Sequence, residues 1–199
     1  MQKVSHIWMD GQYIAWDKAK IHVLTHSLHY GGAVFEGIRF YETAKGSAIF
    51  RLSEHLDRLL YSASVLEMKV PFNKKELSEA IIGLIRKTKI TSGYIRPIIY
   101  YGYGKMGLQT DGAPVNVAIA AWPWGAYLGS EAVKAKISTI MRIHPDTTFA
   151  DAKISGTYYN SILASQEIHK KGYDEAILLD FKGNIAEGPG ENNFIVNKG

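Results

Sequence analysis

Strand-like and helical patterns alternate along the first 124 residues, and this order constrains the fold more than any other feature of the sequence. Residues 33–43 and 94–101 read as long strands rich in β-branched and aromatic side chains. Between them, the apolar residues of 54–68 recur three and four positions apart, which is the spacing of one helix face. A second stripe of this kind follows Asn73. The order predicts an α/β lobe over residues 1–124.

Local signals indicate where several of these elements begin. Asp10 and the glycine after it predict the tight turn of a hairpin over residues 6–16. Ser53 is expected to cap the first helix, and the run from Asn73 to Glu76 reads as a capping box for the second. Two further strands are expected, at residues 48–52, as the partner of 33–43, and at residues 115–122.

The composition changes at residues 125–132, which are expected to link two lobes. The second lobe, residues 133–199, is expected to be rich in strands. Its predicted elements are a strand at 137–143, a polar loop at 144–156, a helix at about 157–171 followed by Gly172, a strand at 176–180, the turn Phe-Lys-Gly-Asn and a final glycine-rich strand pair. A lobe of this size buries little core, so we expect it to be incomplete. The chain as a whole is predicted to be α+β.

Composition argues against several classes of function. The 199 residues contain no cysteine, which removes disulfides, thiolate catalysis and cysteine-ligated zinc. The net charge of +4 is mild and forms no basic stripe, so no nucleic acid partner is expected. No apolar run approaches about 18 residues, so no membrane association is expected. A cytoplasmic protein is predicted.

Two patterns suggest ligand sites but lack the context that such sites require. The glycines of residues 102–107 spell the G-x-G-x-x-G of a dinucleotide site, yet turn-forming residues follow where that motif must open a helix. A mobile loop is the better interpretation. His22, His26 and His29 would share one face of a helix and could then bind a metal ion. Their β-branched neighbours and the lack of a nearby carboxylate favour ordinary polar contacts.

Lys153 differs from the other lysines in its surroundings. Ala152 and Ile154 flank it, a serine and a glycine follow, and these small or apolar neighbours predict burial. A buried lysine has its charged form disfavoured and becomes a usable amine nucleophile. Further along, two glycines and a proline follow Glu187. The small glycines let the backbone and the Glu187 carboxylate approach a flat ligand closely. The plainer interpretations are that Lys153 is an ordinary surface lysine and that the Glu187 segment is a β-turn.

Signature sequences around these residues are similar to those of a known family. K-x-S-G-x-Y from Lys153 and E-G-x-G-E-N from Glu187 resemble the fold-type IV enzymes that use pyridoxal 5′-phosphate (PLP). The N-terminal half adds H-Y-G-G-A-V-F-E-G-I-R-F-Y, E-H-L-D-R-L, Y-I-R-P and P-W-G-A-Y, which look like branched-chain amino-acid aminotransferases in particular. D-Amino-acid aminotransferases and aminodeoxychorismate lyases share the lysine and glutamate segments and generally lack F-E-G-I-R and Y-I-R-P. The resemblance implies that the second lobe belongs to a strand-rich pseudo-barrel.

The resemblance implies catalytic and cofactor-binding roles for particular residues. Lys153 would form the Schiff base with PLP and move a proton as general base and acid. Glu187 would face the pyridine nitrogen, and Tyr158 would hydrogen-bond the ring oxygen O3′. Arg58 would pair with the phosphate, for which a planar fork is better suited than a point charge. Without the resemblance, a surface ion pair with Glu54 would be the plainer interpretation of Arg58.

The resemblance also implies a pocket that accepts two kinds of side chain in turn. Branched-chain L-amino acids (leucine, isoleucine and valine) and 2-oxoglutarate would give branched 2-oxo acids and glutamate. Arg96 matches the family residue that receives the glutamate carboxylate, and Tyr94 lies two residues away on the same strand face. The apolar wall is expected from Phe35, Tyr30, Trp124 and Tyr127. Family members are homodimers at least, and the loop at 103–109 is expected to close over a neighbouring subunit's site.

Chains of this family normally continue beyond residue 199, with glycine- and threonine-rich turns that hold the PLP phosphate. We therefore expect the 199-residue chain alone to be weak or inactive. The alternatives are a D-amino-acid aminotransferase or aminodeoxychorismate lyase of the same fold, and a non-catalytic fragment.

Overall fold

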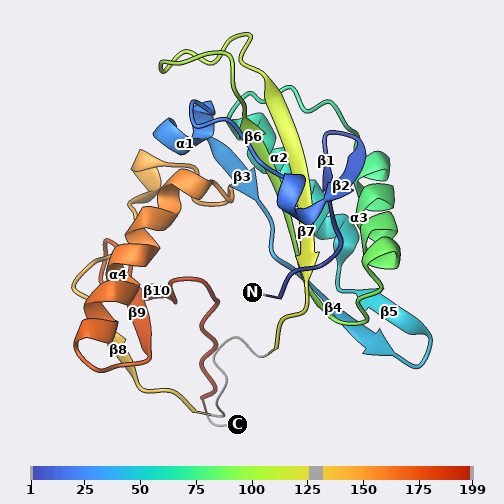
Figure 1. Cartoon of the computed structure of the whole chain (residues 1–199). Coiled ribbons are helices and arrows are strands. Elements are labelled where there is room, and N and C mark those ends of the chain that lie inside the picture. Colours follow the sequence, from blue (N-terminus) through green and yellow to red (C-terminus); the bar gives the residue numbers. More distant parts are fainter. Residues whose placement is uncertain (1, 126–131, 198–199) are drawn as a thin grey trace. The chain divides into compact units, whose positions relative to one another are not determined.

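The computed structural model describes residues 2–125 and 132–197 (Figure 1). The chain divides into two compact units, each held by its own contacts. The first unit comprises Met1–Tyr127 together with Asp151–Ser155, and the second comprises Leu128–Ala150 together with Gly156–Gly199. The segment around Lys153 is thus grouped with the first unit, whereas the sequence prediction placed it in the second lobe. Most of the linker predicted at 125–132 lies outside the described residues.

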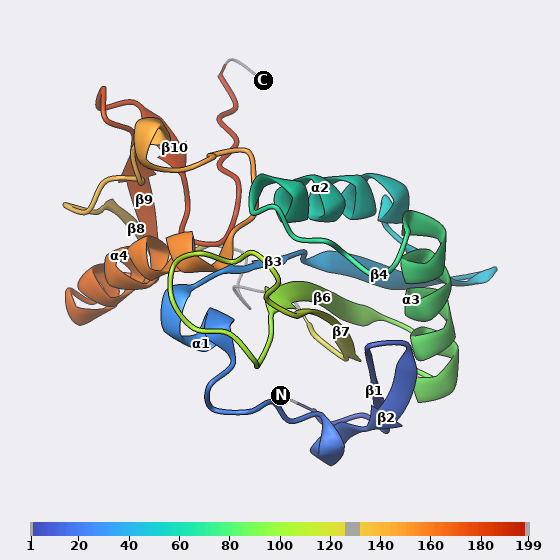
Figure 2. The same ribbon diagram turned by 90° about the horizontal axis from the view of Figure 1, so that it is seen from above.

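The first unit is built on one antiparallel sheet, seen from two directions in Figure 1 and Figure 2. Its described strands are β1 (His6–Met9), β2 (Gln12–Ala15), β3 (Ala33–Phe35), β4 (Ile38–Thr43), β5 (Gly46–Ile49), β6 (Gly93–Tyr101) and β7 (Val115–Trp122). The path across the sheet is β2-β1-β7-β6-β4-β5, and β3 pairs with β6 along the same edge as β4. The long strands predicted at 94–101 and 115–122 form its centre.

Two helices bury their apolar stripes against one face of this sheet. They are α2 (Leu52–Val65) and α3 (Lys74–Thr88), and a short helix, α1 (His26–Tyr30), precedes β3. Leu59 of α2 and Ile81 of α3 are fully buried in the same cluster as Ile95 of β6. Because side chains alternate across a strand, Tyr94 and Arg96 lie on the face of β6 that points away from this core. The helical core therefore leaves the other face of β6 available for a site.

The strand predicted over residues 33–43 is interrupted. β3 ends at Phe35 and β4 begins after Gly37. A Cβ atom at residue 37 would stand 2.0 Å from the hydroxyl oxygen of Tyr94, so glycine is required there. The side chain of Glu36 leaves the strand ladder and hydrogen-bonds to residues of α2. The strand therefore breaks at two adjacent positions, where Glu36 needs polar partners and where only a glycine fits at residue 37.

Element ends differ from the sequence prediction at two places. The partner of β4 is Gly46–Ile49 rather than residues 48–52. α2 starts at Leu52 after Arg51, whose φ is 48°, and among the described residues no side chain caps the helix. The prediction of Ser53 as the cap is wrong, because Ser53 already lies in the first turn.

Two turn signals are confirmed. The Asn73 side chain accepts a hydrogen bond from the Glu76 N–H at 3.0 Å, and the Glu76 carboxylate accepts one from the Asn73 N–H at 2.7 Å. This reciprocal pair is the predicted capping box of α3. Asp10 and Gly11 have φ values of 46° and 92° and form the hairpin turn between β1 and β2. At these two points, short sequence motifs correctly predict where a helix begins and where a hairpin turns.

The second unit contains a small sheet with one helix. The strands β8 (Ala135–Ile137), β9 (Glu175–Leu179) and β10 (Ile185–Glu187) follow the order β10-β9-β8, and the helix is α4 (Tyr158–Lys170). β8 runs parallel to β9, and α4 connects them along the chain. Ala164 and Ile168 of α4 pack against Ala176 and Leu178. Gly172, with φ of 78°, follows α4 as the sequence predicts.

Two predictions for the second unit are wrong. The strand predicted at 137–143 is Ala135–Ile137, because Ser138 and Thr139 turn to the Glu167 carboxylate. The Ser138 hydroxyl donates to it at 2.5 Å and the Thr139 N–H at 2.9 Å. The predicted final strand pair is a single strand, β10, and the described residues after it form no further strand. Within the described ranges, no helix has the length and apolar character needed to span a bilayer.

Candidate functional site

The Lys153 segment is joined to the first unit through its backbone. The Lys153 N–H donates to the Ser62 hydroxyl at 2.9 Å, and the Lys153 carbonyl accepts from the Phe35 N–H at 3.2 Å. The next residue, Ile154, forms an antiparallel bridge with Val34. Lys153 is half-buried. Because both polar groups of its backbone are paired, the direction in which its side chain starts is fixed.

Phe35 brings Lys153 and Arg96 together. The Lys153 ammonium nitrogen lies 5.1 Å from the centre of the Phe35 ring, and the Arg96 guanidinium carbon lies 4.6 Å from the same centre. Arg96 also lies 5.3 Å from the centre of the Tyr94 ring, and its Nη2 donates to the Tyr94 hydroxyl at 3.0 Å. Two cations at one aromatic ring form a site that attracts anionic groups.

One donor in this cluster lacks an acceptor. The Nε atom of Arg96 is buried and has no hydrogen-bond partner within the described part of the chain. Leaving a buried donor unpaired costs about 1–3 kcal/mol. The chemistry of Arg96 therefore fits an acceptor such as the carboxylate of a ligand.

Aromatic rings extend the cluster along the sheet. The Tyr94 ring lies 4.9 Å from the Trp124 ring and 5.2 Å from the Trp122 ring. Arg39 holds the chain just after this point, since its Nη1 donates to the Gly125 carbonyl at 3.0 Å. Trp124 is thus adjacent to Tyr94. Tyr127, predicted for the same wall, lies outside the described residues.

Tyr30 has different neighbours. It lies on α1, with its ring centre 4.6 Å from that of His26. The His26 Nε2 lies 2.7 Å from the Gly107 carbonyl oxygen, and His29 Nε2 lies 2.9 Å from the Val23 carbonyl oxygen. Both histidines therefore make polar contacts of the ordinary kind. Residues 102–107 lead through turns into β7, and among the described residues they open no helix, unlike a dinucleotide motif.

Arg58 is paired with a residue that the sequence reasoning missed. Its Nη2 donates to Oε2 of Glu36 at 2.8 Å, and its Nε donates to Oε1 of the same carboxylate. The plainer interpretation, a pair with Glu54, is wrong, because Glu54 pairs with Arg51 at 2.9 Å. The Arg58 side chain is 48% exposed, so it can meet a ligand from solvent.

The Glu36 carboxylate is fully buried and remains ionised. Burial by itself raises the pKa of Glu36, but hydrogen bonds from His55 and Arg58 and their charges outweigh it and lower the pKa to about 2. His55 Nδ1 lies 2.9 Å from Oε2. The signal that could have revealed Glu36 is a lone carboxylate inside an apolar strand-like run, which must find partners if it is buried.

The second unit holds the two remaining predicted cofactor residues. Tyr158 opens α4, and Glu187 ends β10 with an ion pair to Nε of Arg142. Arg142 was not predicted. Burial raises the pKa of Glu191 to about 7, and the hydrogen-bonded Glu175 carboxylate adds to this rise. Glu191, in the glycine-rich turn after Glu187, therefore lies close to the Glu175 carboxylate of β9.

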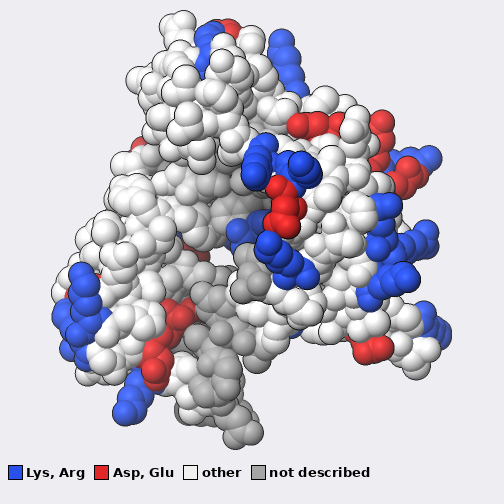
Figure 3. Space-filling model, in the orientation of Figure 1, with Lys and Arg blue, Asp and Glu red and all other residues white. Residues whose placement is uncertain are grey.

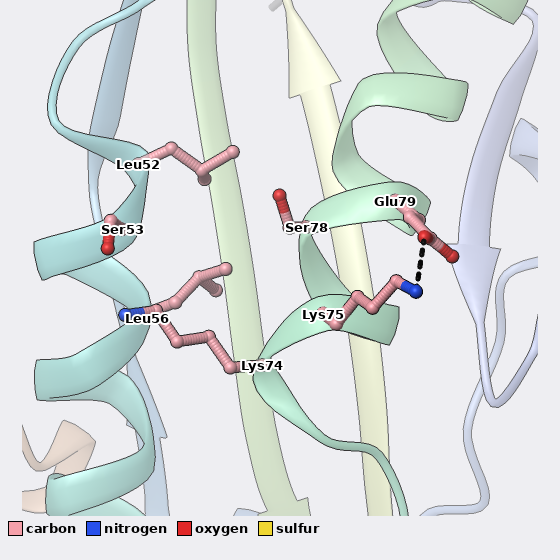
Figure 4. Close-up of a pocket in the computed structure, with 7 residues that line it drawn as sticks. All are labelled: Leu52, Ser53, Leu56, Lys74, Lys75, Ser78 and Glu79. Carbon is pink, nitrogen blue, oxygen red and sulfur yellow. Dashed lines mark ion pairs between the residues drawn. The ribbon is translucent and has the colours of Figure 1, made fainter.

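Other surface features lie outside these residues. Figure 3 shows lysine and arginine side chains interspersed with acidic ones over one face of the molecule. A pocket between α2 and α3, shown in Figure 4, is lined by Leu52, Ser53, Leu56, Lys74, Lys75, Ser78 and Glu79. In it, Lys75 and Glu79 form an ion pair at 4.0 Å. The pocket contains none of the predicted site residues. Among the described residues, no group of three or more histidine or acidic side chains could hold a metal ion.

The fold defines a class of protein, a fold-type IV aminotransferase, and this confirms the predicted fold class. Residues 33–199 match the family described as amino-transferase class IV, and the chain belongs to this family. The chain is 48% identical over 197 residues to a branched-chain-amino-acid aminotransferase of Pseudomonas aeruginosa, covering 97% of this chain and 64% of that protein. It is 45% identical over 203 residues to the Escherichia coli (strain K12) protein of the same name, covering 100% of this chain and 66% of that protein.

Solved structures similar to this chain are also branched-chain aminotransferases. The crystal structure of the Escherichia coli branched-chain amino acid aminotransferase has a TM-score of 0.91 at 44% identity, over 94% of this chain and 64% of that one. The T.th. branched-chain amino acid aminotransferase with pyridoxamine 5′-phosphate has a TM-score of 0.93 at 47% identity, over 100% of this chain and 67% of that one. The chain thus spans about two thirds of the length of its relatives, 64% for the Pseudomonas aeruginosa protein.

Proposed function

We propose that this chain carries the lysine and much of the substrate pocket of a PLP-dependent branched-chain aminotransferase. The reaction transfers the amino group of leucine, isoleucine or valine to 2-oxoglutarate and gives branched 2-oxo acids and glutamate. The observation that carries the proposal is the placement of Lys153 and Arg96 at the Phe35 ring, at 5.1 and 4.6 Å from its centre. The names of the relatives support it.

The residues present fit PLP. Lys153 offers an amine whose backbone is fixed. Arg58 offers a half-exposed planar fork, which suits a phosphate. Tyr158 and Glu187 are assigned to the ring oxygen and the pyridine nitrogen, and Arg142 orients the Glu187 carboxylate. When bound, PLP supplies an electron sink for the charge left at the substrate α-carbon.

In this proposal Lys153 has two tasks. Its amine would hold the cofactor, and as general base and acid it would take the proton from the substrate α-carbon and deliver it to the cofactor. The Phe35 ring, 5.1 Å from the Lys153 ammonium nitrogen, limits where that amine can lie. Such positioning is worth a large part of the rate in proton transfer.

The dual substrate specificity is assigned to the other side of the same cluster. Arg96 receives the γ-carboxylate of glutamate through the donor that has no partner among the described residues. Tyr94 holds the guanidinium in place at 3.0 Å. Phe35, Tyr30, Trp124 and Tyr127 are proposed to contact branched side chains. An arginine at the edge of an aromatic wall accepts both kinds of substrate in turn.

The protein is further proposed to act in the cytoplasm as a homodimer or higher homo-oligomer, with the 103–109 loop over a neighbouring subunit's site. The lack of cysteine is in keeping with a reducing compartment. Amino acids and 2-oxo acids are its proposed small-molecule partners.

The test is the absorbance spectrum of the purified chain with PLP, recorded before and after adding L-leucine. The expected result is a band of lysine-bound cofactor that changes to the pyridoxamine form with L-leucine, slowly, as in a weak enzyme. Lys153→Ala should lose the band, and Lys75→Ala, an exposed lysine on α3, should retain it. A response to D-alanine or aminodeoxychorismate instead of L-leucine would point to another enzyme of this fold. A bound cofactor that responds to no substrate would indicate a non-catalytic chain.

A further inference from the structure

Glu36 is a buried carboxylate at the end of a strand beside the proposed site. It is 0% exposed and follows Phe35, the residue whose ring contacts Lys153 and Arg96. Its own N–H donates to the Pro97 carbonyl at 3.0 Å, so its backbone is anchored to β6. A buried charge is costly unless it is paired and hydrogen-bonded.

Both carboxylate oxygens of Glu36 are engaged. Oε1 accepts from Nε of Arg58, and Oε2 accepts from Nη2 of Arg58 at 2.8 Å. Oε2 also lies 2.9 Å from His55 Nδ1 and accepts from the Gly37 N–H at 3.3 Å. Two parallel bonds between a carboxylate and a guanidinium fix the plane of the guanidinium. Glu36 therefore determines the direction in which Arg58 points.

The same face of α2 also holds Lys153. His55, Arg58 and Ser62 are three and four residues apart and so share one side of the helix. Ser62 accepts the Lys153 N–H at 2.9 Å. On the neighbouring strand, Phe35 donates to the Lys153 carbonyl. The Glu36–Arg58 pair and the Lys153 backbone are thus fixed by the same two elements, α2 and the end of β3.

We propose that Glu36, supported by His55, is a positioning residue that orients Arg58 to receive the phosphate of the cofactor. Glu36 does not itself touch the cofactor. A phosphate is recognised by Arg58 only when the fork meets it in the right plane, and Glu36 sets that plane before binding. This inference rests on the proposed function, which assigns Arg58 to the phosphate.

A carboxylate next to Arg58 has a second, opposite effect. It reduces the positive potential that draws a phosphate to the arginine. If charge were all that mattered, removing the carboxylate would tighten phosphate binding. If orientation dominates, removing it weakens phosphate binding. The two effects predict opposite signs, so one variant distinguishes them.

The experiment measures equilibrium binding of PLP and of pyridoxal, which has the same aldehyde and no phosphate. Glu36→Gln keeps the size of the side chain but removes its negative charge and replaces one of the two carboxylate oxygens with an NH₂ group. The expected result is a loss of PLP affinity of roughly tenfold, the lower end of what orienting partners contribute at metal sites, with pyridoxal affinity unchanged. Glu54→Gln is the matched control, since Glu54 is an exposed carboxylate on α2, the helix that carries Arg58, and it should change neither affinity.

Three results would overturn the inference. They are an unchanged or tighter affinity for PLP, an equal loss for PLP and pyridoxal, and an equal loss in the Glu54→Gln control. If Glu36→Gln fails to fold, His55→Ala removes one Glu36 partner and should give a smaller loss that is again confined to PLP. Arg58→Ala separates the two proposals, because it should abolish the preference for PLP over pyridoxal. If it does not, the assignment of Arg58 fails and the positioning role falls with it.

Discussion

The backbone N–H of Lys153 donates a hydrogen bond to the hydroxyl of Ser62, 2.9 Å away and 91 residues earlier in the chain. Ser62 is fully buried on α2 and belongs to the face that carries Arg58. On the other side, the Lys153 carbonyl accepts from Phe35. These contacts connect the candidate lysine to the helix that carries Arg58 and to the strand that carries Phe35.

Ser62→Ala should destabilise the protein by about 1–3 kcal/mol, because it leaves the half-buried Lys153 N–H without its acceptor. The free energy of unfolding in urea measures this. Ser53→Ala is the control, since Ser53 is exposed on the same helix and does not cap it. That variant should change stability by less than about 0.5 kcal/mol. Equal effects of the two variants would contradict the importance of the Ser62 contact.

Gly37→Ala should displace Tyr94. An added Cβ would stand 2.0 Å from the Tyr94 hydroxyl oxygen, and the rigid ring must move away with its hydrogen bond to Arg96. We expect a loss of about 1–3 kcal/mol in stability and a changed near-ultraviolet circular dichroism spectrum. Gly125→Ala is the control, since an added Cβ there would meet none of the described residues within 4 Å. An unchanged aromatic spectrum in Gly37→Ala would show that Tyr94 does not occupy this place.

Glu36 should make the protein sensitive to acid. Its pKa is lowered from 4.5 to about 2, so its contribution is fully present above pH 4.5 and is lost as the pH falls toward 2. At about 1.4 kcal/mol per pH unit, the contribution is about 3 kcal/mol. Urea unfolding at several pH values measures it. The stability of Glu36→Gln should fall less between these pH values than that of the unmodified chain, and parallel curves would count against the pairing.

Arg96 should distinguish the two substrates. Arg96→Leu should weaken the binding of glutamate by about 10–100-fold and leave the binding of leucine nearly unchanged. The reason is that a charge-assisted hydrogen bond contributes about 1.5–3 kcal/mol. Spectral titration of the PLP-loaded chain with each amino acid measures both affinities. Arg86→Leu, on the exposed side of α3, is the control and should alter neither. An equal loss for leucine and glutamate would remove Arg96 from the carboxylate role.

Sequence periodicity was sufficient for the central elements of the first unit. The apolar spacing around Leu56 and Leu77 predicted the buried faces of α2 and α3, because a helix next to a sheet must hide such a stripe. The capping box at Asn73 was also predictable, since it depends only on residues three positions apart. Structure that depends on residues close together in the sequence can be predicted from the sequence alone.

Long-range contacts could not be predicted in this way. The break at Gly37 depends on Tyr94, and the burial of Glu36 depends on Arg58 and His55, all distant in sequence. The strand expected at 137–143 ends early because the Ser138 hydroxyl hydrogen-bonds to the Glu167 carboxylate, 29 residues away. In the site, the family resemblance supplied Lys153 and Arg96, and only the structure showed that Phe35 lies at both cations.

The role of Lys153 is tested most directly by reducing the purified chain with borohydride in the presence of PLP and mapping its peptides by mass spectrometry. Reduction makes a lysine–cofactor linkage permanent, so the modified residue can be identified. We expect one phosphopyridoxyl group on the peptide that contains Lys153, and none after Lys153→Ala. A group on a different lysine, or equal labelling of the Lys153→Ala variant, would contradict the assignment of Lys153 as the cofactor lysine.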